Sequence, residues 1–185
     1  MGATYISLQA STADREGVLT FSRAFVAAHP NEFSCYVGEP LGAWTAVYPS
    51  LSAVMDLFAK ELSRSLGCVV LSLVSHDEDE VLCNFCENGK DLSFFKISAG
   101  RRRPPKQQGP VAKRLSLLAS HLDAQKQAEL LAYLSDTTAT LDSGEILKTF
   151  CHAVGIRNAM TSYDYIEHGD YHADLDTAVE LVKVG

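Results

Sequence analysis

The chain has 185 residues, of which 46% are apolar and 21% are charged, and it carries a formal net charge of −7. This composition is typical of folded globular domains and excludes disordered, collagen-like and low-complexity chains. No apolar run approaches the roughly 20 residues that a membrane-spanning helix requires, and the first residues lack a signal-peptide pattern. We therefore expect a soluble, cytoplasmic protein that makes no membrane contact.

In chain order, the first hundred residues alternate between helical and strand patterns. A helix is expected after Asp14, with Asp14 or Thr12 as its cap, because Val18 and Phe25 share one apolar face. A longer helix opens at Pro49-Ser50 and keeps the 3.6-residue period until Gly67, which suits a left-handed helix end. Apolar or alternating runs predict strands at 5–9, 33–37, 44–48, 68–74, 81–86 and 92–97.

The resulting order, β-α-β-β-α-β-β-β, predicts an α+β fold with a mainly antiparallel sheet. Its first six elements have the order of a ferredoxin-like βαββαβ sandwich with two helices on one face. The Asn88-Gly89 pair adds a hairpin to this sheet, because both residues tolerate positive φ. The run 68–74 is almost continuously apolar, which indicates a strand covered on both faces.

A composition break separates this part from the rest of the chain. Residues 101–106 carry four bases and no acid, and they include a proline pair that interrupts regular structure. We expect a sheet domain at 1–100, a basic Pro-rich linker at 101–110 and a mainly helical subdomain at 111–185, which packs on the sheet because its own core is small. Its predicted helices are 111–122, 124–134, 142–154 and a final one after Asp174 or Asp176 that carries Leu175, Val179 and Val182.

Five cysteines in a chain without an export signal favour free thiols over a disulfide framework. Cys83 and Cys86 form a CxxC motif, which could be half of a zinc site or a redox pair. No second pair of ligands follows, and residues three apart in a strand point to opposite faces. We therefore expect structural thiols, one in the core and one half exposed.

The densest charge is the run His76-Asp77-Glu78-Asp79-Glu80, which follows a strand. Such carboxylates could bind a divalent cation, act as an acid–base pair, form a solvated loop or contact a basic partner. The run lacks the glycine and the spacing of an EF-hand loop. A solvated turn is the simplest interpretation, and electrostatic contact with a basic protein surface is the function that the charges favour.

Two histidines four residues apart, His168 and His172, would share a face of a helix, as in HExxH metal sites. Gly169 disfavours a helix there, and no glutamate occupies the general-base position, so a polar turn is favoured. A metal-dependent enzyme or metal-binding protein is kept as the alternative function. Its candidate ligand sets are His76 with Asp77 and Asp79, or His168 with His172.

Trp44 is the only tryptophan, and it begins a predicted strand. Strand alternation puts its ring on the same face as Ala46 and Tyr48. Large aromatic side chains dominate burial in small domains, so core packing is favoured. A place in a binding surface near the acidic run is the alternative.

Several short motifs together resemble an uncharacterised group of bacterial cytosolic proteins, which have a Trp strand, an HDxD turn before an apolar strand, and a late Gly-Ile segment. The matching residues are Gly38-Glu39-Pro40-Leu41-Gly42-Ala43-Trp44, His76-Asp77-Glu78-Asp79, Glu87-Asn88-Gly89-Lys90 and Gly155-Ile156. Phe94-Phe95-Lys96-Ile97 departs from the more polar strand of that group. The resemblance implies a non-enzymatic, immunity-like module.

These observations lead to one functional hypothesis, a soluble non-catalytic binding protein with a basic protein partner. The chain has no Walker A loop, Rossmann glycine pattern or GxSxG elbow, and we expect no metal and no cofactor. Four linker bases beside two acidic regions are too few for a nucleic-acid footprint. The expected binding residues are Trp44, His76, Asp77, Glu78, Asp79 and Glu80.

Overall fold

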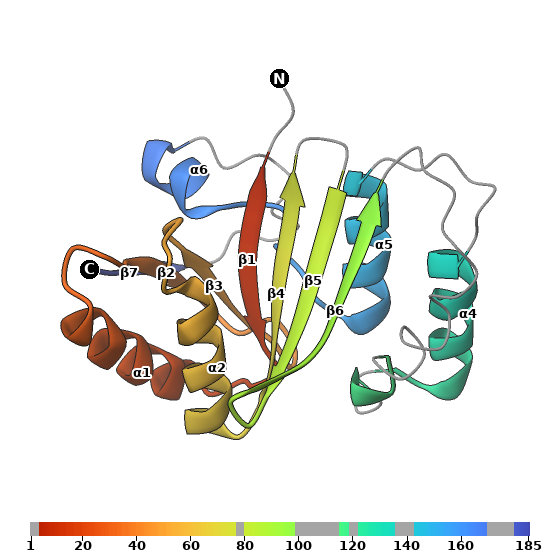
Figure 1. Cartoon of the computed structure of the whole chain (residues 1–185), viewed down its shortest axis with the longest axis horizontal. Helices are drawn as coiled ribbons and strands as arrows, with labels where there is room; N and C mark the ends of the chain where they lie inside the picture. Colours follow the sequence, from red (N-terminus) through yellow and green to blue (C-terminus); the bar gives the residue numbers. More distant parts are fainter. Residues whose placement is uncertain (1–3, 77–79, 99–114, 119–121, 136–142, 170–179) are drawn as a thin grey trace.

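A computed structural model describes residues 4–76, 80–98, 115–118, 122–135, 143–169 and 180–185 as a mixed α/β fold built on one antiparallel sheet (Figure 1). The strands are β1 (Tyr5–Ala10), β2 (Cys35–Gly38), β3 (Thr45–Pro49), β4 (Val69–His76), β5 (Glu80–Glu87), β6 (Lys90–Ser98) and β7 (Leu181–Val184). The helices are α1 (Arg15–Ala28), α2 (Met55–Leu66), α4 (Ala124–Ser135), α5 (Ser143–Val154) and α6 (Tyr163–His168), with a 3-10 turn at Ser116–Leu118. In the sheet, the strand order is β6-β5-β4-β1-β3-β2-β7.

The α+β class and the antiparallel sheet are confirmed, but the sheet has seven strands and is larger than the predicted ferredoxin-like sandwich with a hairpin. The additional strand is β7, which pairs with β2, so the prediction of a final helix is wrong at 181–184. Val182 and Val184 pack on the core while Lys183 is exposed, and the edge of β2 supplies hydrogen-bonding partners. Pairing at that edge outweighs the helical pattern of the sequence. Residues 174–179 lie outside the described ranges.

The first two helices begin and end through local interactions. Asp14 caps α1, because its Oδ1 accepts a hydrogen bond from the Gly17 amide at 2.9 Å, as predicted. Gly67 ends α2 in the left-handed conformation at φ 61°. The second helix begins at Met55 rather than at Pro49-Ser50, and Leu51 is 79% exposed. No helix in the described part of the chain combines the length and apolar character needed to cross a bilayer.

Both faces of the sheet are covered over most of its width. The helices α1 and α2 pack on one face, where the Phe25 ring contacts Phe33 and Phe58 edge to face and the latter two rings are stacked. The other face packs against α4 and α5 together with Trp44. In β4, Val70 belongs to the first core and Leu71 to the second, which confirms that this strand is covered on both sides.

The described residues of the C-terminal half contribute to the second core. Most of the predicted helix at 111–122 lies outside the described ranges, and its described part includes the 3-10 turn Ser116–Leu118. Asp123 caps α4 by accepting a hydrogen bond from the Lys126 amide at 2.8 Å, and α5 ends at Gly155. Leu115 and Leu118 are fully buried against α4, α5 and the sheet. Residues from both predicted domains therefore share one core, and the predicted linker 101–110 lies outside the described ranges.

Three buried donors of the sheet hold the segment that follows α5. The Trp44 indole Nε1 donates to the Val154 carbonyl at 3.0 Å. The Tyr48 hydroxyl donates to the Asn158 carbonyl at 2.7 Å, and Ser7 Oγ donates to the Ala159 carbonyl at 3.2 Å. A buried polar group that loses its partner costs about 1–3 kcal/mol, so these contacts fix the segment in place.

A polar and aromatic cluster attaches β7 and α6 to β2. The Glu167 carboxylate accepts hydrogen bonds from the Tyr36 hydroxyl and from Lys183 Nζ, the latter at 2.6 Å. The same ammonium lies over the Tyr36 and Tyr163 rings, 5.7 and 5.8 Å from their centroids. These contacts stabilise the last strand of the sheet through charge-assisted hydrogen bonds and cation–π attraction.

Replacing Trp44 with alanine should destabilise the protein by about 3–5 kcal/mol, because the substitution leaves a cavity and an unpaired Val154 carbonyl. Trp44 is 2% exposed, so its fluorescence should also be blue-shifted in the wild type. Urea unfolding followed by circular dichroism measures the loss. Leu51→Ala is the control, since Leu51 is exposed and should change stability by less than about 0.5 kcal/mol. Unchanged stability of Trp44→Ala would contradict the assignment of the ring to the core.

Candidate functional site

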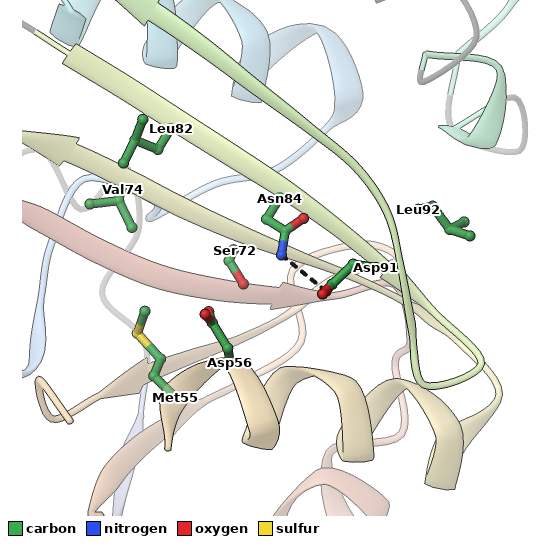
Figure 2. Close-up of a pocket in the computed structure, with 8 residues that line it drawn as sticks. All are labelled: Met55, Asp56, Ser72, Val74, Leu82, Asn84, Asp91 and Leu92. Atoms are coloured by element: carbon green, nitrogen blue, oxygen red, sulfur yellow. Dashed lines mark hydrogen bonds between the residues drawn. The ribbon is translucent and has the colours of Figure 1, made fainter. Parts of the chain in front are cut away.

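An open pocket of about 580 Å³ lies between the start of α2 and the outer strands of the sheet (Figure 2). Its volume is within the range of ligand-binding pockets in proteins, about 300–1,000 Å³. It is on the face of the sheet that α1 and α2 cover. The lining residues are Met55, Asp56, Ser72, Val74, Leu82, Asn84, Asp91 and Leu92.

Strand alternation explains which side chains face the pocket. Ser72 pairs with Asn84, and Val74 pairs with Leu82. These even-numbered positions of β4 and β5 lie on the α2 side, whereas the odd-numbered Leu73 and Cys83 belong to the opposite core. Val74 and Leu82 are only half-buried, so this part of the sheet has an accessible apolar surface.

A β-bulge brings Asp91 onto the same face. Phe85 pairs with Ser93, but the next residue of β5, Cys86, pairs with Asp91, so Leu92 is an extra residue of β6. Without that extra residue, alternation would place Asp91 on the other side of the sheet. The bulge therefore sets Asp91 beside Asn84 and leaves Leu92 40% exposed at the rim of the pocket.

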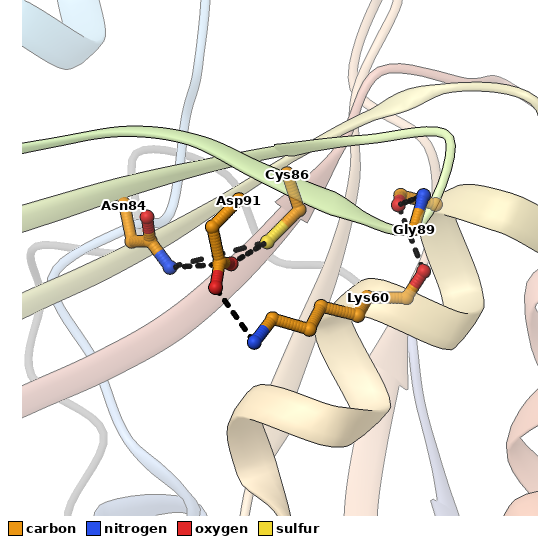
Figure 3. A network of polar contacts seen from close by, with 6 residues as sticks. Lys60, Asn84, Cys86, Gly89 and Asp91 are labelled. Atoms are coloured by element: carbon orange, nitrogen blue, oxygen red, sulfur yellow. Dashed lines mark hydrogen bonds and ion pairs between the residues drawn. The ribbon is translucent and has the colours of Figure 1, made fainter.

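Asp91 is the centre of a polar network, which Figure 3 shows from close by. Its Oδ1 accepts hydrogen bonds from Asn84 Nδ2 and Cys86 Sγ, each at 3.2 Å, and its Oδ2 forms an ion pair with Lys60 Nζ at 2.6 Å. Next to this network, the Gly89 amide donates to Ser63 Oγ at 2.9 Å and ties the β5–β6 turn to α2. The network thus links α2, β5 and β6 at the floor of the pocket.

The network shifts the acidities of its members. Partial burial alone would raise the pKa of Asp91, but the hydrogen bonds from Lys60, Cys86 and Asn84 outweigh it and lower the pKa. The pKa of Lys60 is raised, mainly by its hydrogen bond to Asp91. Burial raises the pKa of Cys86 to about 12, so its thiol remains a protonated donor to Asp91 at neutral pH.

The two described residues of the predicted acidic run, His76 and Glu80, are at one end of the same sheet face. His76 ends β4 and is exposed, and its pairing partner is Glu80 at the start of β5. Asp77, Glu78 and Asp79 lie outside the described ranges. Trp44, the other predicted binding residue, is not near a surface, because its ring is in the core that faces α5.

The residues of the metal-binding alternative are not gathered where the structure describes them. His168 is the last residue of α6, and its Nδ1 lies 2.7 Å from the Asp164 carbonyl oxygen. His172 lies outside the described ranges, as do both acids of the other candidate ligand set, Asp77 and Asp79. Within the described ranges, no three His, Cys, Asp or Glu side chains are grouped as metal ligands would be.

The CxxC thiols diverge, as strand alternation predicted. Cys83 packs in the core that faces α5, and Cys86 packs on the α2 side. The prediction that one of them is half exposed is wrong, because both side chains are buried. The hairpin formed by β5 and β6 reaches far enough over α2 to cover Cys86, and the sequence pattern does not indicate this.

No sequence pattern identifies the polar residues of the pocket, which are Asn84, Asp91, Ser72 and Asp56. Each is a common polar residue without a motif around it, and only strand register and the bulge bring them together. The one available signal was an Asn and an Asp on the two strands of a predicted hairpin, too general to mark a site.

Replacing Asp91 with asparagine should lower the free energy of unfolding by about 0.5–1.5 kcal/mol at neutral pH, a modest value because the carboxylate is partly exposed. The pKa of Asp91 is lowered by folding, so its contribution exists above the ordinary value near 3.8 and disappears as the pH falls through the folded value. Urea unfolding at neutral and acidic pH should therefore show the two proteins converging in acid. Glu39→Gln, at an exposed acid in the β2–β3 connection, should show no such convergence. A difference between wild type and Asp91→Asn that persists in acid would contradict the network.

The native thiols should react very slowly with a disulfide reagent at about pH 8, because only thiolates react. Burial raises the pKa of Cys35 to about 12 and of Cys68 to about 11, and it raises the pKa of Cys151 as well. Colorimetric titration should find all five thiols only after denaturation. Rapid reaction of one native thiol would show an accessible, activated cysteine instead.

Comparison with known proteins adds no relative from which a function could be transferred. The resemblance to a bacterial group therefore remains a hypothesis based on short motifs. No protein-family model matches the chain, and no curated protein or solved structure is significantly similar to it.

Proposed function

We propose that the protein is a non-catalytic binding protein that holds a basic segment of a protein partner against the open face of β4 and β5. The observation that carries this proposal is the pocket between α2 and the outer strands. It is open, partly apolar and acidic, which are the properties that a basic, amphipathic protein segment requires. The role would be immunity-like or regulatory.

The register of β4 and β5 extends this surface to the acidic run. Ser72, Val74 and His76 alternate onto one face, and their partners Asn84, Leu82 and Glu80 lie on the same face. The pocket and the ends of both strands therefore form one strip. In sequence, Asp77, Glu78 and Asp79 connect the two ends, so the strip leads into the densest negative charge of the chain.

The charges favour a basic partner. The carboxylates of Asp56 and Asp91 line the pocket, and one ammonium, that of Lys60, balances only one of these two charges. The chain as a whole has a net charge of −7. This negative electrostatic field increases the rate of association with a positively charged surface and disfavours binding of acidic partners.

Binding is favoured over catalysis because the polar groups of the pocket are occupied with one another. Asp91 uses both carboxylate oxygens in the network, and the Cys86 thiol is protonated. Neither is available as a base or nucleophile at neutral pH.

We also infer a ferredoxin-like unit within the larger sheet, and a reducing, cytoplasmic location. The strand order β4-β1-β3-β2, with antiparallel pairing and with α1 and α2 on one face, supports the unit. Five free, buried cysteines support the location, because disulfides are rare in reducing compartments.

The proposal is tested by replacing Asp77, Glu78, Asp79 and Glu80 with lysine. Proteins that co-purify with the wild type are identified by mass spectrometry, and the affinity of the purified pair is measured by calorimetry. The variant should bind at least about tenfold more weakly, and wild-type binding should weaken as salt is raised.

The matched control carries the same charge change elsewhere on the fold, with lysine at the exposed acids Glu16, Glu32, Glu39 and Glu129. It should bind like the wild type, and circular dichroism should show that both variants fold. Equal binding by the two variants would show that the 76–80 run is only a solvated turn. Stoichiometric zinc, manganese or calcium in the purified protein would favour the metal-dependent alternative.

A further inference from the structure

The pocket contains a buried hydroxyl group that lacks a partner. Ser72 is 5% exposed, and its Oγ forms no hydrogen bond with any residue that the structure describes. In Figure 2 this oxygen points into the pocket, toward the start of α2. Buried polar side chains nearly always have a hydrogen-bonding partner, and an unsatisfied one calls for an explanation. The missing partner is a hydrogen-bonding group, which a bound ligand is able to provide.

A carboxylate faces the same space from the helix. Asp56 is exposed in the first turn of α2, and its side chain points into the pocket in Figure 2. No ion pair joins Asp56 to another described residue, whereas Asp91 is paired with Lys60. Two carboxylates and one ammonium leave this region with a net negative charge, and the ligand group that suits the Asp56 carboxylate is a cation with several N–H donors.

Another part of the pocket lining is apolar. Met55, Val74 and Leu82 line it beside the two acceptors, and Leu92 lies at the rim. A long aliphatic stem can lie along such a wall while its charged head reaches the acceptors. Together, the acceptors and the wall match a side chain with an apolar stem and a cationic, hydrogen-bonding head.

From this arrangement we infer that the pocket receives the side chain of an arginine from the partner segment, with its guanidinium on the Asp56 carboxylate and the Ser72 hydroxyl. The inference rests on the proposed function, because it names the residue that the binding surface recognises. Arginine suits the site better than lysine does. Its planar head carries five N–H donors and is weakly hydrated, so it can bond to a carboxylate and a second acceptor at once.

The test uses three small probes, N-acetyl-arginine methylamide and the corresponding lysine and citrulline compounds. Citrulline keeps the shape of arginine and removes its charge. Each probe is titrated into the isotope-labelled full chain, and amide shifts are followed by NMR. The arginine probe should saturate with shifts centred on Asp56, Ser72 and Asn84, at a dissociation constant of about 1 mM or weaker.

Citrulline should bind about tenfold more weakly than arginine, and lysine several-fold more weakly. Asp56→Asn and Ser72→Ala should each weaken binding of the arginine probe about three- to tenfold. Asp56→Asn should change binding of the citrulline probe little. Glu16→Gln is the matched control, since Glu16 is an exposed acid in the first turn of α1. It should leave the affinity unchanged.

Three results would overturn the inference: no saturable shifts at the pocket, equal affinity for arginine and citrulline, or unchanged arginine binding in both pocket variants. Thermal unfolding of each variant shows whether it is folded, and the conservative Ser72→Thr variant, which keeps the hydroxyl, should retain arginine binding. The probes need no partner protein, so their failure is distinct from failure of the proposed function. A partner whose binding depends on residues 77–80 but not on Asp56 or Ser72 would leave that function intact and remove the arginine site.

Discussion

The fold depends on a set of hydrogen bonds between buried donors in or beside the sheet and the backbone carbonyls at the end of α5 and just after it. Trp44, Tyr48 and Ser7 come from three places in the N-terminal half, and their acceptors at Val154, Asn158 and Ala159 lie more than 100 residues later in the chain. Without the C-terminal half, each donor would lose this acceptor. The two halves are therefore joined by polar interactions as well as by a shared apolar core.

Coverage of the second face by the C-terminal half determines where an open surface can occur. On the first face, α1 and α2 cover the strands at the centre, and the outer strands extend past α2. The pocket lies where the outer strands extend past α2, and there Val74 and Leu82 are half-buried. The bulge in β6 then turns Asp91 onto this face, and Lys60 compensates its charge from the helix. The pocket therefore combines a polar side, formed by the Asp91 network, with an apolar side.

This arrangement connects the proposed function with the arginine site. His76 and Glu80, the two ends of the predicted acidic run, lie on one strip of sheet with the pocket, since they continue the alternation of Val74 and Leu82. In the proposed function, long-range attraction to the acidic run would bring a basic segment near the strip, and short-range hydrogen bonds in the pocket would select one of its side chains. The two contributions are separable, because charges at the end of the strip act at a distance and Ser72 acts only in contact.

The sequence alone determined most of the secondary structure, because periodicity and capping are local. Asp14 and Asp123 cap their helices, Gly67 and Gly155 end theirs, and six strands are where alternation predicted them. It also indicated the burial of Trp44 through the size and strand position of this residue. The tertiary structure alone decided three features: that 181–184 is a strand, that both CxxC thiols are buried, and that Ser72, Asn84, Asp91 and Asp56 share a pocket. The strand at 181–184 depends on which strand edge is available, the burial of the thiols on how far the β5–β6 hairpin extends over α2, and the pocket on a one-residue bulge. Such long-range geometry leaves no periodic signal in the residues concerned.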